Sequence, residues 1–159
     1  MKIRTARPAD AEKICLTHKA SIKSLCAGDY SESQIAGWLE ILSPSIYNSA
    51  MNDKIMIVAE SAGEILGLGI LDALNREICA IYVNPSATGR GLGKKILFDL
   101  EQRARLNGLS DLSLCSTINA LGFYEHHGYE EVEASQHELP NGTILKCIKM
   151  HKKSLKESS

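Results

Sequence analysis

The sequence has no long apolar run and no excess of charge of either sign. No segment approaches the ~20 apolar residues of a membrane span, and the N-terminal stretch MKIRTARPADAEKI has no apolar signal core. The 18 Lys and Arg residues are balanced by 19 Asp and Glu residues, so the overall charge indicates neither a nucleic acid nor an anionic membrane as a partner. We therefore expect a soluble cytoplasmic protein whose partners have to be inferred from local motifs.

Paired cysteine and histidine motifs are also lacking. The five cysteines are scattered, odd in number and free of any CxxC pair: Cys15, Cys26, Cys79, Cys115 and Cys147. This distribution is typical of reduced thiols in a cytosolic protein rather than of a disulfide framework or a zinc site. The adjacent His126 and His127 would lie about 100° apart on a helix, which is poor for joint metal binding. We expect no metal site.

The length of 159 residues and a hydrophobic content of 44% fit one domain. Apolar patterns and turn residues predict strands at 2–7, 55–61, 65–74, 76–83 and 112–116. They predict helices at 10–25, from Ser31, after Ser43-Pro44, at 91–107 and, as a short one, at 119–127. A hairpin around Asn141-Gly142 follows. This order predicts a mixed α/β (α+β) domain with an antiparallel meander over residues 1–151 and a polar tail at 152–159.

The stretch IYVNPSATGRGLGKKIL, residues 81–97, places Gly89, Gly91 and Gly93 between a strand and a basic helix start. A P-loop would need a glycine at position 88 and a hydroxyl residue at position 95, but the sequence has Thr88 and Lys95 there. A dinucleotide fingerprint would need the spacing G-x-G-x-x-G. The remaining interpretation is a loop whose backbone N–H groups and helix start face a pyrophosphate, or a plain turn before a closely packed helix.

This loop resembles the acetyl-CoA loop of the GCN5-related N-acetyltransferase (GNAT) superfamily, whose pattern is Gln/Arg-x-x-Gly-x-Gly/Ala. Gly91 and Gly93 match, and Thr88 stands at the Gln/Arg position. The later stretch NALGFYEHHGY is similar to the family's Ala-x-x-Phe/Leu-Tyr-x-x-x-Gly-Phe/Tyr signature, with Tyr124 as its tyrosine. Thr117 stands where an Asn is common, and Asn119 is a candidate substitute. The resemblance covers residues 2–150 and implies a largely antiparallel central sheet, flanked by helices and splayed between its central strands.

The resemblance implies an acetyl-CoA-dependent N-acyltransferase that acts on a primary amine of a small molecule or peptide by direct transfer in a ternary complex. Tyr124 would be the acid that meets the departing thiolate, and Glu77, on the strand before the loop, would be the base. The alternatives are that Tyr124 is a core residue and that Glu77 is a solvated carboxylate. By strand alternation Glu77, Cys79, Ile81 and Val83 share one side, unless a bulge intervenes. For Cys79 we favour a small buried residue over a thiol acceptor.

The implied site residues fall into two groups. The cofactor would be held by residues of the strand end, the glycine loop and the second motif: Ile81, Tyr82, Val83, Thr88, Gly89, Arg90, Gly91, Leu92, Gly93, Lys94, Asn119 and Phe123. The acceptor region would be CAGDYSESQIAGW, which resembles the Y-x-x-x-Q-I-x-x-W element of a bacterial subgroup. There Tyr30 and Trp38, with His18, Asp29 and Glu40, form an aromatic and acidic mouth for a cation, or pack in the core.

Acetyl-CoA is thus the expected co-substrate and an amine the expected partner, with no nucleic acid and no membrane, and with a homodimer left open. The rival interpretation is a non-catalytic CoA-binding regulatory module, which would bind acetyl-CoA without forming product.

Overall fold

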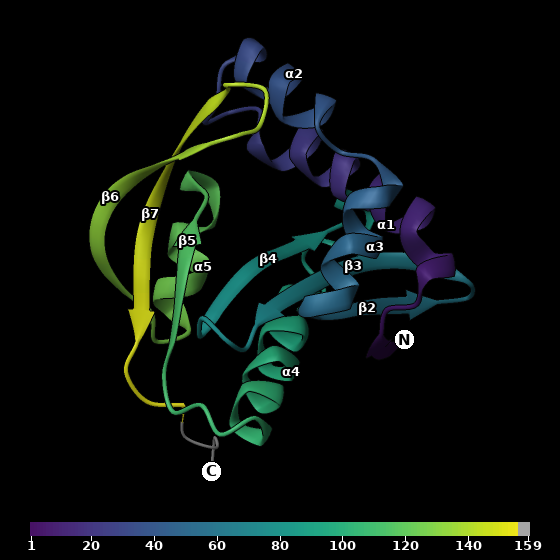
Figure 1. The fold of residues 1–159 in the computed structure, drawn as a ribbon. Coiled ribbons are helices and arrows are strands. Elements are labelled where there is room, and N and C mark those ends of the chain that lie inside the picture. Colours follow the sequence, from purple (N-terminus) through teal and green to yellow (C-terminus); the bar gives the residue numbers. More distant parts are fainter. Residues whose placement is uncertain (156–159) are drawn as a thin grey trace.

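The computed structural model describes residues 1–155 and contains a seven-stranded sheet with helices on both faces (Figure 1). The strands are β1 (Lys2–Thr5), β2 (Ile55–Ser61), β3 (Glu64–Asp72), β4 (Glu77–Val83), β5 (Leu112–Ser116), β6 (Glu130–Glu138) and β7 (Ile144–Lys152). The helices are α1 (Ala11–Ser21), α2 (Glu32–Glu40), α3 (Pro44–Asp53), α4 (Leu92–Leu106) and α5 (Leu121–His126). Short helical turns are η1 (Pro8–Asp10), η2 (Ile22–Cys26), η3 (Pro85–Ala87) and η4 (Ile118–Ala120).

The strands follow the order β1-β2-β3-β4-β5-β7-β6, and every neighbouring pair is antiparallel except β4 and β5. This confirms the predicted mixed, largely antiparallel sheet. The capping box is also present, because Ser31 Oγ accepts the N–H of Gln34 at 3.1 Å and Gln34 Oε1 accepts the N–H of Ser31 at 2.8 Å. The predicted helix at 10–25 differs, since α1 ends at Ser21 and continues as the π-helical turn η2.

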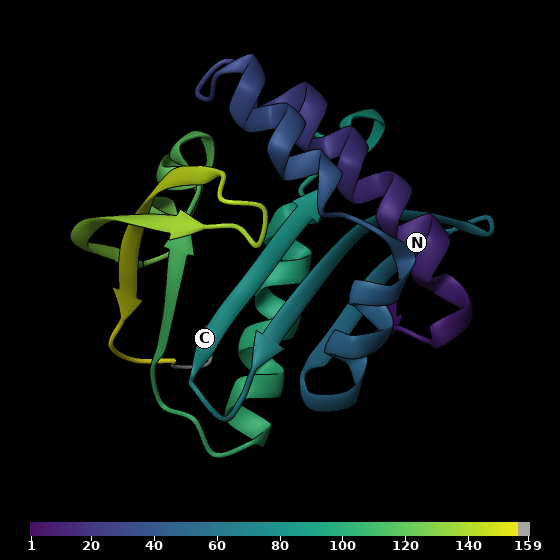
Figure 2. The same cartoon turned by 45° about the horizontal axis from the view of Figure 1, so that its top comes forward.

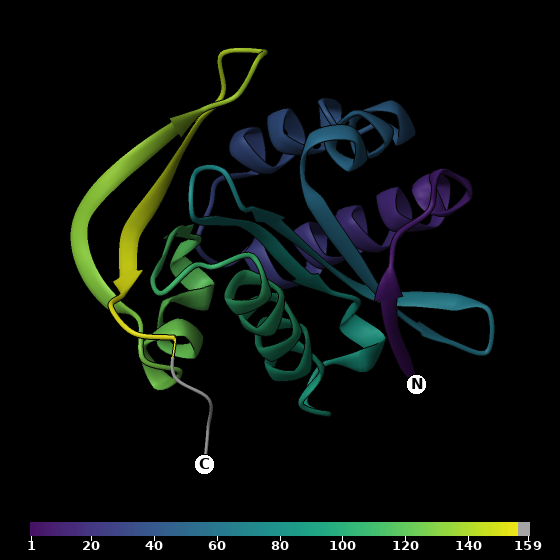
Figure 3. The ribbon, with the colours of Figure 1, turned by 60° about the horizontal axis from the view of Figure 1, so that its bottom comes forward.

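Helices cover the sheet from opposite sides (Figure 3). Along β2, Val58 packs into the core beneath α1, α2 and α3, and its neighbour Ile57 packs into the core beneath α4. This alternation follows from the two-residue period of a strand, and the continuous apolar run of β2 is typical of a strand that is buried on both faces. Helix α4 lies directly on β3, where a Cβ added at Gly69 would come within 2.7 Å of Ile96 Cγ2.

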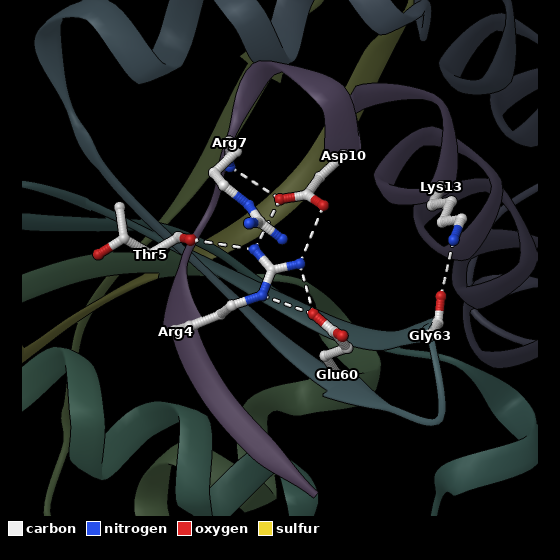
Figure 4. Close-up of polar contacts among 7 residues, drawn as sticks. All are labelled: Arg4, Thr5, Arg7, Asp10, Lys13, Glu60 and Gly63. Atoms are coloured by element: carbon white, nitrogen blue, oxygen red, sulfur yellow. Dashed lines mark hydrogen bonds and ion pairs between the residues drawn. The ribbon is translucent and has the colours of Figure 1, made fainter.

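An ion network fastens the N-terminal strand to the start of the first helical turn (Figure 4). Arg4 makes two hydrogen bonds to Asp10, at 2.8 and 3.0 Å, and also pairs with Glu60 on β2. The Asp10 carboxylate in addition accepts the backbone N–H of Arg7 at 2.7 Å. The hydrogen bonds from Arg4 hold the pKa of Asp10 below its usual value.

The two central strands β4 and β5 separate along their length (Figure 2). They pair in parallel only at Glu77 with Ser113 and at Ile78 with Leu114. Beyond these pairs the strands diverge, which confirms the expected splay. The edge of β4 that faces β5 is therefore open from Cys79 onward.

A β-bulge at Cys79 changes which residues of β4 share a face. Ile70 of β3 pairs with Ala80, but Leu71 pairs with Ile78, so Cys79 is the extra residue. Ile78 and Ile81, three positions apart, consequently face the same core beneath α4. The expected alternation of Glu77, Cys79, Ile81 and Val83 was conditional on the absence of a bulge. The bulge breaks it, and Glu77 lies on the face opposite to Ile81 and Val83. Cys79 itself is exposed at the bulge rather than buried.

The C-terminal hairpin of β6 and β7 extends toward α2 (Figure 1), where Asn141 Nδ2 donates to the carbonyl of Gly37 at 2.8 Å. Cys115 of β5 and Cys147 of β7 form a disulfide, which differs from the expectation of reduced thiols only. Their strands are neighbours, and this places the two Cα atoms 5.8 Å apart, within the range that a disulfide spans.

The expected boundary between a domain at 1–151 and a tail at 152–159 stays a prediction. Strand β7 includes Lys152, and Leu155 is buried and donates its N–H to the carbonyl of Ser110 at 2.9 Å. Residues 156–159 lie outside the described part of the chain. Among residues 1–155, no helix combines the length and the apolar character that a membrane crossing would need.

Candidate active site

A cavity of about 470 Å³ lies between the end of β4, the glycine loop and α5. All the predicted cofactor residues line it except Arg90, which is exposed beside it. The wall also contains three residues from the end of α1 and from η2 that the motifs did not indicate: Ser21, Leu25 and Cys26. Their local sequence does not indicate that they line a cavity, because their position there depends on how α1 crosses the sheet.

The glycine loop presents the start of α4 to this cavity. Gly91 is the N-cap residue of α4 with a φ of +74°, a conformation that a residue with a Cβ adopts only at a cost. The first hydrogen bond of the helix runs from the N–H of Lys95 to the carbonyl of Gly91. The N–H groups of Leu92, Gly93 and Lys94 are thus left without a partner within the helix, at its positive end. This arrangement suits a phosphate group.

The open edge of β4 supplies further hydrogen-bonding groups. Asn84, directly after β4, donates its N–H to the carbonyl of Leu66 on β3 at 2.7 Å. Successive N–H groups of a strand point to opposite sides, so those of Ile81 and Val83 point away from β3, toward the gap left by β5. They are free to pair with an extended ligand that enters the splay, as a further strand would.

Tyr124 of α5 lies in the wall of the same cavity. Its ring is 6% exposed and packs edge-on against Phe123 and Tyr129. Burial raises its pKa above the usual range, so its hydroxyl stays protonated near neutral pH. Within the described residues this hydroxyl makes no hydrogen bond to the protein. The ring of Tyr124 thus packs in the core, as the alternative interpretation expected, while the residue also lines the first cavity.

A second cavity, of about 260 Å³, lies on the other side of the splay. Glu77 lines it together with Tyr82, because the bulge at Cys79 turns Glu77 toward the face that carries Tyr82. Tyr30 and Trp38, each 6% exposed, form another part of its wall. The predicted acceptor residues and the predicted base are thus brought to one cavity.

The predicted acidic mouth is not formed as expected. Asp29 and Glu40 are exposed and do not line the second cavity, and among residues 1–155 Glu77 is the one carboxylate in its wall. Tyr30 is also fixed by the protein, since its hydroxyl donates to the carbonyl of Lys146 at 2.7 Å and accepts the N–H of Ile118 at 3.2 Å. Tyr30 therefore shapes the cavity and leaves little hydrogen-bonding capacity for a ligand.

A small cavity of about 30 Å³ lies in the splay itself. Tyr82 and Thr117 line this cavity and both larger ones. Tyr124 belongs to the wall of the small cavity and of the first, whereas Cys79 and Cys115 belong to the wall of the small cavity and of the second. The two large cavities therefore meet across the gap between β4 and β5.

Comparison with known proteins identifies the same fold and family. A model of the acetyltransferase (GNAT) domain matches residues 26–153. The spermidine N(1)-acetyltransferase of Thermoplasma acidophilum is 27% identical over 143 residues, which cover 82% of this chain and 88% of that protein. A crystal structure from Rhodopseudomonas palustris, described as a GCN5-related N-acetyltransferase, has a TM-score of 0.90 and 27% identity, over 96% of this chain and 94% of that one.

A further solved structure with the same fold contains coenzyme A. The PaiA N-acetyltransferase of Thermoplasma acidophilum, solved in complex with coenzyme A, has a TM-score of 0.79 and 22% identity, over 96% of this chain and 98% of that one. At this identity the likeness shows the fold alone. The family match, which covers most of the chain, carries the assignment: this protein belongs to the acetyltransferase (GNAT) family and is an acetyltransferase.

Proposed function

We propose that the protein transfers the acetyl group of acetyl-CoA directly to a primary amine of a small molecule or peptide, with both bound at once. The observation that carries this proposal is the meeting of two cavities at Tyr82 and Thr117. One cavity has the glycine loop and the open strand edge, and the other has the carboxylate of Glu77. A thioester and an amine that enter from opposite sides would meet in the splay without a covalent enzyme intermediate.

The amine has to lose a proton and the thiolate has to be stabilised as it leaves. An alkylamine has a pKa of about 10 and is an ammonium ion near neutral pH, so its nitrogen gives up two protons when it becomes an amide. One proton goes to solvent, and the other balances the proton that the sulfur gains, since a thiol has a pKa of about 8.5. Glu77 lines the second cavity, which we call the acceptor cavity, and would accept the amine proton directly or through a water. Tyr124 lines the first cavity, which we call the cofactor cavity, and would donate its hydroxyl proton to the departing sulfur. The N–H groups of Ile81 and Val83 point to the place where the oxyanion and the pantetheine arm would lie.

The proposal is tested by measuring CoA release with a panel of amines, including spermidine because of the archaeal relative. Tyr124→Phe should lower kcat by about 10²-fold, the usual contribution of a general acid, while the Kd for acetyl-CoA stays the same. Glu77→Gln should lower kcat similarly and shift the pH profile. The matched control for Glu77→Gln is Glu64→Gln, because Glu64 is exposed and lies outside all three cavities.

The rival interpretation, a non-catalytic CoA-binding module, gives a different pattern. Calorimetry would then show acetyl-CoA binding, but no amine would release CoA, and neither Tyr124→Phe nor Glu77→Gln would change product formation. Turnover with any amine would exclude that rival.

A cytoplasmic location belongs to the same proposal, since acetyl-CoA is made and used inside the cell.

A further inference from the structure

The acceptor cavity has a polar side and an apolar side. The polar side comes from the sheet, where Glu77 and Tyr82 of β4 and Thr117 after β5 line it. The opposite side comes from α2 and its flanks and from the hairpin of β6 and β7, which contact each other where Gln34 donates to the carbonyl of Ile144 at 3.0 Å (Figure 1). The lining residues of that side are apolar or aromatic: Tyr30, Trp38, Ile41, Leu42, Leu139 and Leu145.

Charge is scarce in this wall. Among residues 1–155, Glu77 is its one carboxylate. Lys146 belongs to the wall through its backbone, because its neighbours Leu145 and Cys147 are buried on the cavity side and side chains alternate along a strand. Burial lowers the pKa of His18 to about 3, so that ring is neutral. The wall therefore provides a partner for one positive charge.

The cavity is also small. Its volume of about 260 Å³ lies below the roughly 300–1,000 Å³ of pockets for drug-sized ligands, and it equals that of about nine waters. A second charged group at the far end of an acceptor would lie against Trp38 or Leu145 and not beside a carboxylate. A contact with the Trp38 ring offsets only part of the hydration that such a group loses.

We propose that the acceptor is a small monoamine whose nitrogen carries its only charge and whose body is apolar, either an alkyl chain or an aromatic ring. This rests on the proposed function and names the class of amine. The nitrogen would lie on the sheet side, and the body would pack against α2 and the hairpin. Polyamines, amino acids and peptides fit less well, because each brings a further charge or polar backbone that the apolar side leaves unpaired.

The first test compares three amines as acetyl acceptors by CoA release: n-hexylamine, phenethylamine and cadaverine. Cadaverine has the length of n-hexylamine but ends in a second ammonium group instead of a methyl group. Both apolar amines should exceed it at least about tenfold in kcat/KM, mainly through a lower KM, because the second ammonium loses hydration without gaining a carboxylate. A kcat/KM for cadaverine equal to or above those of both apolar amines would overturn the proposal.

A carboxylate added to the apolar side should reverse part of this preference. His137 is exposed, lines the cavity and lies opposite Leu145 in the register of the hairpin, so a substitution there does not disturb the core. His137→Glu should lower the ratio of kcat/KM between n-hexylamine and the best of a series of diamines of increasing length. His126→Glu makes the same change at an exposed site outside the acceptor cavity and should keep the native ratio. If both variants keep it, charge does not select the acceptor and the proposal fails.

Binding can be measured apart from turnover, because Trp38 is the one tryptophan of the chain. In the presence of CoA, n-hexylamine should change the fluorescence of Trp38 and saturate at a concentration at least about tenfold lower than cadaverine. No response to n-hexylamine, or a tighter response to cadaverine, would overturn the class of acceptor. A response to n-hexylamine without CoA release from acetyl-CoA by any amine would instead overturn the proposed function and leave the class of ligand standing.

Discussion

Tyr129, at the junction of α5 and β6, donates its hydroxyl proton to the buried carboxylate of Glu101 on α4 at 2.8 Å. Lys152 at the end of β7 reaches the same carboxylate oxygen at 3.0 Å. The second motif, residues 119–129, therefore has a structural half at Tyr129 and a half at Tyr124 for which we propose a catalytic role. Tyr129 joins α5 to α4 and β7, and this contact fixes the helix on which Tyr124 stands five residues earlier.

Tyr129→Phe should lower the free energy of unfolding by about 1–3 kcal/mol, because it leaves a buried carboxylate oxygen with one partner fewer. Urea denaturation followed by circular dichroism measures this loss. Tyr124→Phe should cost much less stability, since its hydroxyl has no partner in the protein. If the two variants were equally stable, the division of the motif into these halves would be wrong.

Gly91→Asp should abolish acetyl-CoA binding in calorimetry. The substitution places a carboxylate beside the expected pyrophosphate and forces a Cβ onto a residue with a φ of +74°. Gly63→Asp is the matched control, because Gly63 has a φ of +80° but lies in the turn between β2 and β3, away from the cavity. Gly63→Asp should lose stability and keep the native Kd. Loss of binding in both variants would mean that backbone strain alone is responsible.

The disulfide between Cys115 and Cys147 predicts how many cysteines react with a thiol reagent before and after reduction. Unfolded in the absence of a reductant, the protein should react at Cys15, Cys26 and Cys79, and after reduction also at Cys115 and Cys147. Cys115→Ser should lower the stability of the oxidised protein by about 2–4 kcal/mol, whereas Cys79→Ser should leave it nearly unchanged. A quantitative thiol titration under denaturing conditions decides the count. Five reactive thiols before reduction would exclude the bond in solution.

The ion network around Arg4 predicts that the free energy of unfolding depends on pH in the acidic range. The hydrogen bonds from Arg4 depress the pKa of folded Asp10 below the value of about 3.8 that it has in an unfolded chain. Its stabilising contribution is thus complete above that value and is lost as the pH falls through the folded-state pKa. Asp10→Asn should be less stable than the native protein at pH 7, and this difference should shrink below roughly pH 4.

Urea midpoints over a series of pH values check this prediction. Asp99→Asn serves as the control, because the pair of Asp99 with Arg103 on α4 is more exposed than the pair of Arg4 with Asp10 and should be worth less than about 1 kcal/mol at any pH. A difference between Asp10→Asn and the native protein that stays constant down to roughly pH 2 would show that Asp10 acts through packing and not through its charge.

The part of the site that sequence could predict is the part that is built locally. The loop around Gly91 and the motif around Tyr124 each bring their groups together within a few residues, so their spacing carries the geometry. The capping box at Ser31 and the exact bounds of β2 and β5 were predictable for the same reason. The family resemblance then ordered these pieces into one sheet.

What sequence could not predict depends on register and on distant neighbours. The bulge at Cys79 has no signature in its own residues, and it reverses the side on which Glu77 lies. The pairing of Cys115 with Cys147 requires β5 and β7 to be neighbours, although 32 positions separate the two cysteines. His18 was expected in an aromatic and acidic mouth, but it is buried beside Tyr47 of α3, and burial keeps its ring neutral.

The bulge at Cys79 divides β4 into two segments whose side chains alternate in opposite phases. In the segment after it, Ile81 and Val83 pack toward α4 and line the cavity of the glycine loop. The segment before it carries Glu77 into the acceptor cavity, and loss of the extra residue would send that side chain to the opposite face without disturbing the loop. One extra residue in one strand thus separates the segment that borders the glycine loop from the segment that carries Glu77 into the second cavity.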